Sequence, residues 1–267
     1  MTTSRRSILK GAGATVLGLA TANANANAAP TPAGKTFVLV HGAWHGGWCW
    51  VRVADKLRAK GHKVFTPTLT GLADRSHLMS AQITLDTHID DIVNFFKWND
   101  LSEVVLVAHS YGGWPVSGAI EKVLSRVSSI IYLDAFMPEN GQKGIDLNSP
   151  LSSKGLLDAV TKGQVSRPAP PAAAFHIHDP KDAAWVEGKL TEQPIGVGLH
   201  PITMTGAREK VAKKTYIRAR EYPSPNFDTW LAAAKAKPDW KTYELDSGHL
   251  VMLDMPDRLV EILLERA

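Results

Sequence analysis

A serine among small residues has the clearest chemical meaning in this sequence. Residues 104–113 read VVLVAHSYGG, so a short β-branched apolar run stops at Ser110. This composition predicts a strand buried on both faces, and the residues after Tyr111 return to helical spacing. Ala108 and Gly112 are the small residues that a sharp strand-to-helix turn requires, with alanine at the first glycine of the G-x-S-x-G elbow. The pattern indicates a nucleophilic serine, and an ordinary strand-helix junction capped by serine is the alternative interpretation.

A serine hydroxyl needs a base to take its proton and donors for the oxyanion. His249 follows Gly248 on the loop after the last predicted strand, and we interpret it as the general base. The glycine-rich residues 41–48 (HGAWHGGW) follow an earlier predicted strand. In enzymes with a serine elbow, one oxyanion donor comes from this loop and one from the residue after the nucleophile. The predicted oxyanion-hole residues are therefore Ala43 and Tyr111.

The elements that must position these groups alternate along the chain. Apolar runs predict strands at residues 36–40, 62–67, 104–109, 129–133, 215–219 and 240–245. Helical spacing covers residues 50–60, 85–96, the segment after Ser110, residues 227–236 and a C-terminal helix from about Pro256. This alternation predicts an α/β fold, with a mostly parallel sheet and helices on both faces.

The pattern breaks down between about residues 141 and 210. Residues 167–171 (RPAPP) exclude a regular helix there, and the neighbouring apolar residues have no strong period. We expect this insertion to form a cap at the carboxyl ends of the strands, where ligands of open α/β sheets bind. A packed surface subdomain without substrate contact is the alternative.

The first 28 residues have the character of an export signal. A twin-arginine motif at residues 4–10 (SRRSILK) precedes a weakly apolar run, and an Ala-x-Ala sequence at residues 26–28 fits a cleavage site. We expect export by the twin-arginine route, which leaves one domain, residues 29–267, in the periplasm or outside the cell. Cleavage removes three cations and no acid, so the net charge falls from +4 to +1. The remaining charge favours neither nucleic acid nor a membrane surface as a partner.

The sequence indicates no metal or cofactor. His176 and His178 are two residues apart but have no third ligand nearby, so we interpret them as surface residues. Cys49 is the one cysteine, which excludes an internal disulfide, and we expect it to be a buried thiol.

Together these residues resemble the α/β-hydrolase superfamily, and within it the branch of plant methylesterases, hydroxynitrile lyases and related bacterial esterases. The resemblance rests on residues 37–50 (FVLVHGAWHGGWCW), the elbow and the Gly-His loop, and it covers nearly all of residues 29–267 except the cap. Residues 66–71 (TPTLTG), 75–78 (RSHL) and 132–136 (YLDAF) are similar to bacterial esterases that include a carbamate-cleaving hydrolase of benzimidazole fungicides. The resemblance implies an α/β-hydrolase fold and the chain order serine, acid, histidine, with no cofactor.

The triad acid is where the sequence departs from this branch. The branch usually has an aspartate shortly after the strand at residues 215–219, where only Glu221 is available here. Asp134 ends the apolar strand after the elbow, another position that some α/β-hydrolases use, and a carboxylate in such surroundings needs a partner. We favour Asp134 over Glu221, and Asp246 and Asp228 rank below both.

Two positions separate esterases from cyanide-releasing lyases within the branch. The lyases carry threonine and lysine where this chain has Gly42 and Leu250, so the resemblance implies a hydrolase. The predicted substrate-pocket residues are Gly42, Trp44, Trp114, Phe136 and Leu250. We predict a serine hydrolase of small apolar or aromatic carboxylic esters, with carbamates as a further substrate class and an acyl-enzyme intermediate. A hydroxynitrile-lyase-type enzyme and a non-enzymatic small-ligand receptor on the same fold are the alternatives.

Overall fold

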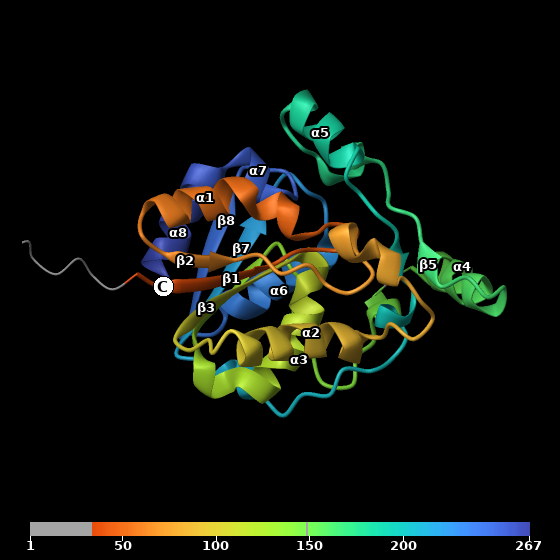
Figure 1. The fold of residues 1–267 in the computed structure, drawn as a ribbon, viewed down its shortest axis with the longest axis horizontal. Coiled ribbons are helices and arrows are strands. Elements are labelled where there is room, and N and C mark those ends of the chain that lie inside the picture. Colours follow the sequence, from red (N-terminus) through yellow and green to blue (C-terminus); the bar gives the residue numbers. More distant parts are fainter. Residues whose placement is uncertain (1–33, 148) are drawn as a thin grey trace, which may run out of the picture. The chain divides into compact units, whose positions relative to one another are not determined.

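The computed structural model describes residues 34–147 and 149–267, so the predicted export signal at residues 1–28 lies outside the described residues. A six-stranded sheet with the strand order β2-β1-β3-β4-β7-β8 forms the centre of residues 34–267 (Figure 1). Its strands are β1 (Thr36–Val40), β2 (Lys63–Phe65), β3 (Val104–His109), β4 (Val127–Leu133), β7 (Lys213–Ala219) and β8 (Trp240–Leu245). Every neighbouring pair is parallel, which confirms the predicted α/β architecture.

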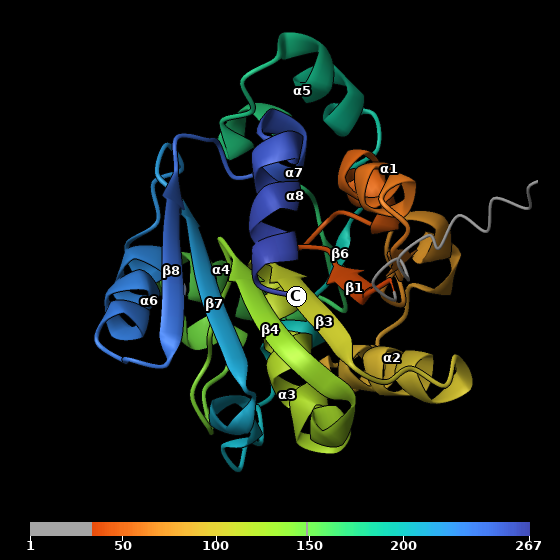
Figure 2. The ribbon, with the colours of Figure 1, turned by 90° about the vertical axis from the view of Figure 1, so that its left-hand side faces the viewer.

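Helices cover both faces of the sheet, and its central strands β1 and β3 are accordingly apolar on both faces. In β1, Phe37 and Leu39 belong to the core beneath α1 (Val51–Ala59), α7 (Val251–Asp254) and α8 (Pro256–Glu265). Val38 and Val40 belong to the opposite core, with α2 (Leu85–Trp98), α3 (Gly113–Val123) and α6 (Pro225–Lys235) (Figure 2). Successive side chains of a strand point to opposite faces, so one apolar run supplies both cores.

The helix starts follow local capping chemistry. The side chains of Thr84 and Thr87 form a reciprocal capping box at the start of α2. The Ser224 hydroxyl accepts the backbone N–H of Phe227 at the start of α6, and Pro256 is the first residue of α8. These are short-range signals, and the observed bounds therefore lie within a few residues of the predicted ones.

Residues 141–210 contain more regular structure than we predict from the sequence. They form α4 (Pro150–Thr161), α5 (Pro180–Glu187) and a small antiparallel pair, β5 (Ser166–Arg167) with β6 (Gln193–Pro194). α4 leaves Leu151 81% exposed and Leu157 51% exposed. Apolar residues on such a helix do not mark one buried face, and the periodicity that identifies a helix is therefore weak.

Short 3-10 helices of three to six residues lie in the connections. They are Gly47–Trp50, Ala73–Leu78, Ser110–Gly112, Leu124–Arg126, Gly144–Leu147, Ala172–Phe175, Gly196–Gly198 and Ala207–Lys210. Among the residues that the structure describes, no helix combines the length and apolar character needed to cross a membrane.

Candidate active site

Ser110 lies on a tight turn between β3 and α3. Its φ of 52° is in the left-handed region, which a residue with a side chain adopts at a cost. Gly112 permits the close approach, because a Cβ there would lie 2.7 Å from the carbonyl oxygen of His41. The turn therefore presents the serine hydroxyl at the carboxyl end of a central strand. Strand β1 has β2 as its neighbour on one side and β3 on the other, so the strand order reverses at β1, and ligands bind at such a reversal.

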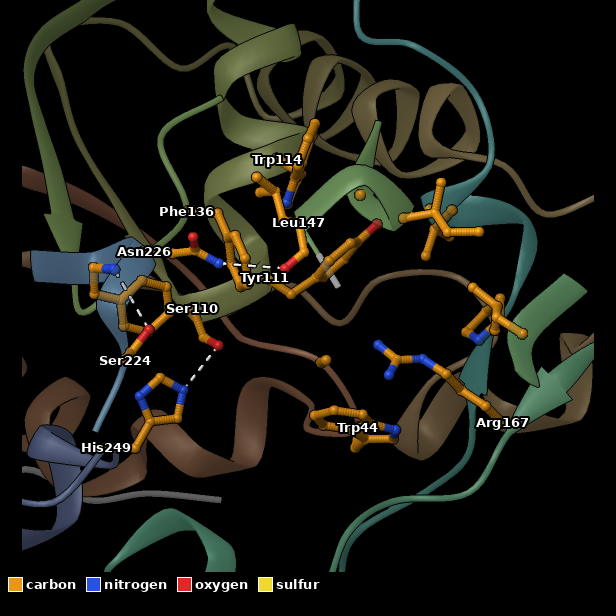
Figure 3. A pocket seen from close by; sticks show the side chains of 18 of the residues that line it. Trp44, Ser110, Tyr111, Trp114, Phe136, Leu147, Arg167, Ser224, Asn226 and His249 are labelled. Carbon is orange, nitrogen blue, oxygen red and sulfur yellow. Dashed lines mark hydrogen bonds between the residues drawn. The ribbon is translucent and has the colours of Figure 1, made fainter. Parts of the chain in front are cut away.

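His249 approaches this serine from the loop after β8. The distance from its Nε2 to Ser110 Oγ is 2.8 Å (Figure 3). The loop is held on both sides: the backbone N–H of His249 donates to the carbonyl of Phe175, and that of Gly248 donates to the buried carboxylate of Asp254. The imidazole is thus positioned by contacts with the cap and with α7.

Asp134 completes a chain of hydrogen bonds. It follows β4 with a φ of 42°, is fully buried, and places Oδ2 2.6 Å from His249 Nδ1. Its Oδ1 accepts from the guanidinium of Arg218 at 2.8 Å and from the backbone N–H of Ala219 at 3.1 Å. These bonds hold the carboxylate in place, and only a His249 tautomer with its proton on Nδ1 can donate to Asp134 and accept from Ser110.

The other acidic residues considered from the sequence pair with groups other than His249. Glu221 is half exposed, and its Oε2 is 2.6 Å from His178 Nε2. Asp246 pairs with Arg220 at the surface, and Asp228 pairs with Arg218. The structure thus brings Asp134, and none of these three, to His249.

The predicted oxyanion loop lies beside the serine. Ala43 and Tyr111 both line the cavity that contains Ser110 and His249. His41 anchors the loop: its Nδ1–H donates to the carbonyl of Gly42 at 2.8 Å, while its Nε2 accepts the backbone N–H of Leu69 at 3.0 Å. Burial lowers the pKa of His41 to about 3, so the ring stays neutral and keeps both bonds.

His88 supports the same region from α2. Its Nε2–H donates to the carbonyl of Thr70 at 2.8 Å, and its Nδ1 accepts the hydroxyl of Tyr111 at 2.9 Å. Burial lowers the pKa of His88 to about 4 and raises that of Tyr111. Both groups are therefore neutral, and the pair fixes the phenol beside the elbow.

We expect His88→Gln to reduce the acid sensitivity of the fold. Below the ordinary histidine pKa of 6.5 the unfolded chain gains a proton at this position, which the folded chain accepts only near pH 4. The free energy of unfolding therefore falls as the pH falls through this window. The variant has a lower free energy of unfolding than the parent at pH 7.5. The difference between the two free energies narrows by about 2 kcal/mol as the pH falls from 6.5 to 4.5.

Urea unfolding at a series of pH values measures this difference. His77→Gln is the matched control, because it makes the same substitution at an exposed histidine. If the difference in free energy of unfolding between His88→Gln and the parent does not change with pH, the assignment of His88 as a buried neutral ring is contradicted.

A cavity of about 210 Å³ opens at Ser110. Trp44, Trp114 and Phe136, three of the five residues proposed from the sequence for a substrate pocket, line this cavity (Figure 3). Its volume lies below the ~300–1,000 Å³ of sites that hold drug-sized ligands. The cap contributes much of the wall, through Gly144, Ile145, Leu147, Leu156, Arg167, Phe175, Pro194, Ile195, Val197 and Gly198.

Two predicted pocket residues lie outside this wall. Gly42 is behind the serine, where a Cβ would lie 2.8 Å from the Ser110 Cβ, so it provides room for the elbow. Leu250 is fully buried in the core beneath α7 and α8, because the loop turns its side chain away from the cavity.

Sequence reasoning did not identify the cap residues that line the cavity. The irregular pattern of this segment gives no signal for the direction of a side chain, and Arg167 is the member with the most distinctive chemistry.

The fold and the Ser110-His249-Asp134 geometry define a doubly wound α/β protein with a serine elbow. The model of the alpha/beta hydrolase family matches residues 37–262, and the chain belongs to this family. It is 35% identical over 239 residues to the carbendazim hydrolyzing esterase of Nocardioides sp. (strain SG-4G), a match that covers 84% of this chain and 96% of that protein. Methylesterase 10 of Arabidopsis thaliana is 26% identical over 251 residues, with 86% of this chain and 91% of that protein covered.

Solved structures show the same fold. An extracellular alpha/beta-hydrolase from a Paenibacillus species superposes with a TM-score of 0.74 at 22% identity, over 87% of this chain and 99% of that one.

Proposed function

We propose that the chain is a serine esterase with Ser110 as nucleophile, His249 as general base and Asp134 as the acid of the triad. The chain is a carboxylic ester hydrolase of the alpha/beta hydrolase family, as its esterase relatives indicate. One observation carries the serine mechanism: hydrogen bonds run without a break from Ser110 Oγ through both nitrogens of His249 to Asp134 Oδ2, beside a cavity.

In this mechanism His249 Nε2 takes the Ser110 proton as Oγ attacks the ester carbonyl. The backbone N–H groups of Ala43 and Tyr111 stabilise the tetrahedral oxyanion, and each contributes roughly 3 kcal/mol to lowering the barrier. The imidazolium then protonates the leaving alcohol, and an acyl-enzyme remains. Water, deprotonated by His249, releases the acid and restores Ser110. Asp134 holds the ring in the required tautomer and stabilises its charged form.

Small apolar or aromatic esters are the proposed substrates, and carbamates are a further class. The aromatic walls of Trp44, Trp114 and Phe136 and the modest cavity volume support a compact substrate. The 35% identity to an esterase named for carbendazim hydrolysis supports testing carbamates.

Short p-nitrophenyl esters distinguish this function from its alternatives. We expect the protein to cleave the acetate and butyrate esters with a higher kcat/KM than the laurate or palmitate esters, because a long chain exceeds the cavity. A preference for the long-chain esters would contradict the compact site. Release of cyanide from mandelonitrile would indicate a lyase, and inertness toward every activated ester would indicate a receptor.

We also propose export by the twin-arginine route, with cleavage after residue 28. The twin-arginine motif and the Ala-x-Ala site support it. Mass spectrometry of the protein recovered from periplasm and medium, beside a variant with both arginines replaced by lysine, tests this proposal.

A further inference from the structure

Arg167 differs from every other residue of the cavity wall. The remaining side chains are apolar or aromatic, or carry neutral polar groups, apart from the titratable His249. Arg167 alone carries a permanent charge, and Figure 3 shows its guanidinium pointing into the cavity from the side away from Ser110 and His249. A fixed cation in a mostly apolar wall requires an explanation.

The guanidinium has no anionic partner in the described part of the chain. Among residues 34–147 and 149–267 it makes no ion pair and no hydrogen bond, and its contact is the face of Trp44, 4.5 Å from the ring centroid. Glu192 directly precedes β6, the partner strand of β5, but its carboxylate accepts from Ser166, which precedes Arg167 in β5 and points to the other side. Burial lowers the pKa of Arg167, as expected for a cation that has lost water without gaining a counter-charge.

Contacts between β5, β6 and the loop after β1 fix the position of Arg167. Arg167 pairs with Gln193 across the antiparallel strands β5 and β6, and the Gln193 side chain accepts the backbone N–H of Trp44 at 3.0 Å. The carbonyl of Trp44 accepts the N–H of Thr191 at 3.0 Å. The β5–β6 strand pair and the adjacent Thr191 thus hold both members of the Arg167–Trp44 stack, so the Arg167 side chain is preorganised.

We propose that Arg167 binds a carboxylate that the substrate carries at the end remote from its scissile ester bond. The inference rests on the proposed esterase function and deepens it: the substrate is a half-ester or a carboxylate-bearing aryl ester. A guanidinium forms two parallel hydrogen bonds with a carboxylate, while Trp44 covers its face. The apolar walls between Arg167 and Ser110 then contact the body of the substrate. Among the small aromatic esters proposed above, this selects those that carry a carboxylate at the end remote from the ester bond.

Two matched pairs of esters test the inference on either side of the ester bond. Monomethyl terephthalate and methyl 4-carbamoylbenzoate place a carboxylate or a neutral amide on the acyl side. 4-Acetoxybenzoate and 4-acetoxybenzamide place the same groups on the alcohol side. Within each pair, the ratio of kcat/KM for the anion to kcat/KM for the amide measures the effect of the carboxylate charge on turnover.

We expect this ratio to fall about 10–100-fold in Arg167→Gln for at least one pair, and Arg167→Lys to recover part of it. Lys162→Gln removes one charge from the exposed end of α4 in the same cap and is the matched control for general charge effects. A ratio that is unchanged in Arg167→Gln for both pairs, or that changes equally in Lys162→Gln, overturns the inference and leaves Arg167 as a structural stack on Trp44.

A binding measurement separates this inference from the proposed chemistry. Isothermal titration of monomethyl terephthalate and of 4-acetoxybenzoate into Ser110→Ala requires no turnover, and we expect one of them to lose at least tenfold in affinity when Arg167→Gln is added. Hydrolysis of neutral esters with no effect of Arg167 on binding or on the ratio contradicts the carboxylate site alone. Absence of all hydrolysis with Arg167-dependent binding contradicts the esterase mechanism and supports the site.

Discussion

Replacing Ser110 with alanine is expected to lower kcat for p-nitrophenyl butyrate on the order of a millionfold, to a residual rate supplied by the binding site and the oxyanion donors. The variant keeps His249 and Asp134 but has no oxygen to form the acyl-enzyme. Alanine retains the Cβ of serine, so the left-handed backbone at φ 52° gains no new clash. The fold, measured by thermal unfolding, therefore persists while turnover is lost.

Ser117→Ala is the matched control for this experiment. Ser117 is a buried serine of α3 whose hydroxyl pairs with that of Tyr132 at 2.8 Å, and it does not line the cavity. We expect it to retain esterase activity. Mass spectrometry after treatment with phenylmethylsulfonyl fluoride adds a direct readout, because the reagent is expected to label the parent at Ser110 and leave Ser110→Ala unlabelled. Retention of activity in a folded Ser110→Ala protein would refute the serine mechanism.

Asp134→Asn is expected to lower kcat by about 10⁴-fold with a smaller effect on KM. The amide nitrogen can face His249 Nδ1, and it then favours the tautomer that carries its proton on Nε2, which cannot accept from Ser110. The imidazolium formed during attack also loses its counter-charge. Arg218 donates to the same carboxylate, so we expect the variant to be less stable as well, and thermal unfolding must accompany the kinetics.

Glu221→Gln is the matched control, since it removes a carboxylate that lies near the same loop and pairs with His178. It is expected to remain active. Activity in Asp134→Asn together with loss in Glu221→Gln would instead place the acid at the position that plant methylesterases and their relatives usually use, and would show that the His249 loop rearranges during catalysis.

The sequence by itself determined the elements that depend on neighbouring residues. The run at 104–109 specifies a buried strand because its apolar residues are contiguous, and the small residues around Ser110 specify the sharp turn. The ends of β8 were predicted to the residue, and a loop position for His249 followed from Gly248. The resemblance to the α/β-hydrolases rests on the same local motifs.

Only the tertiary structure decided which carboxylate reaches His249. Asp134 and His249 are 115 residues apart, and their contact depends on β4, β7 and β8 being neighbours in the sheet, with Arg218 and Ala219 of β7 holding the carboxylate. Glu221 is closer to His249 in sequence yet points to His178.

The tertiary structure also decided which residues face the cavity. Gly42 and Leu250 are adjacent to active-site residues in sequence but lie outside the wall, whereas Arg167 enters it from the irregular cap. The physical reason is that short-range propensity sets where a strand or turn forms, while the direction of a loop side chain is set by contacts between segments far apart in the chain.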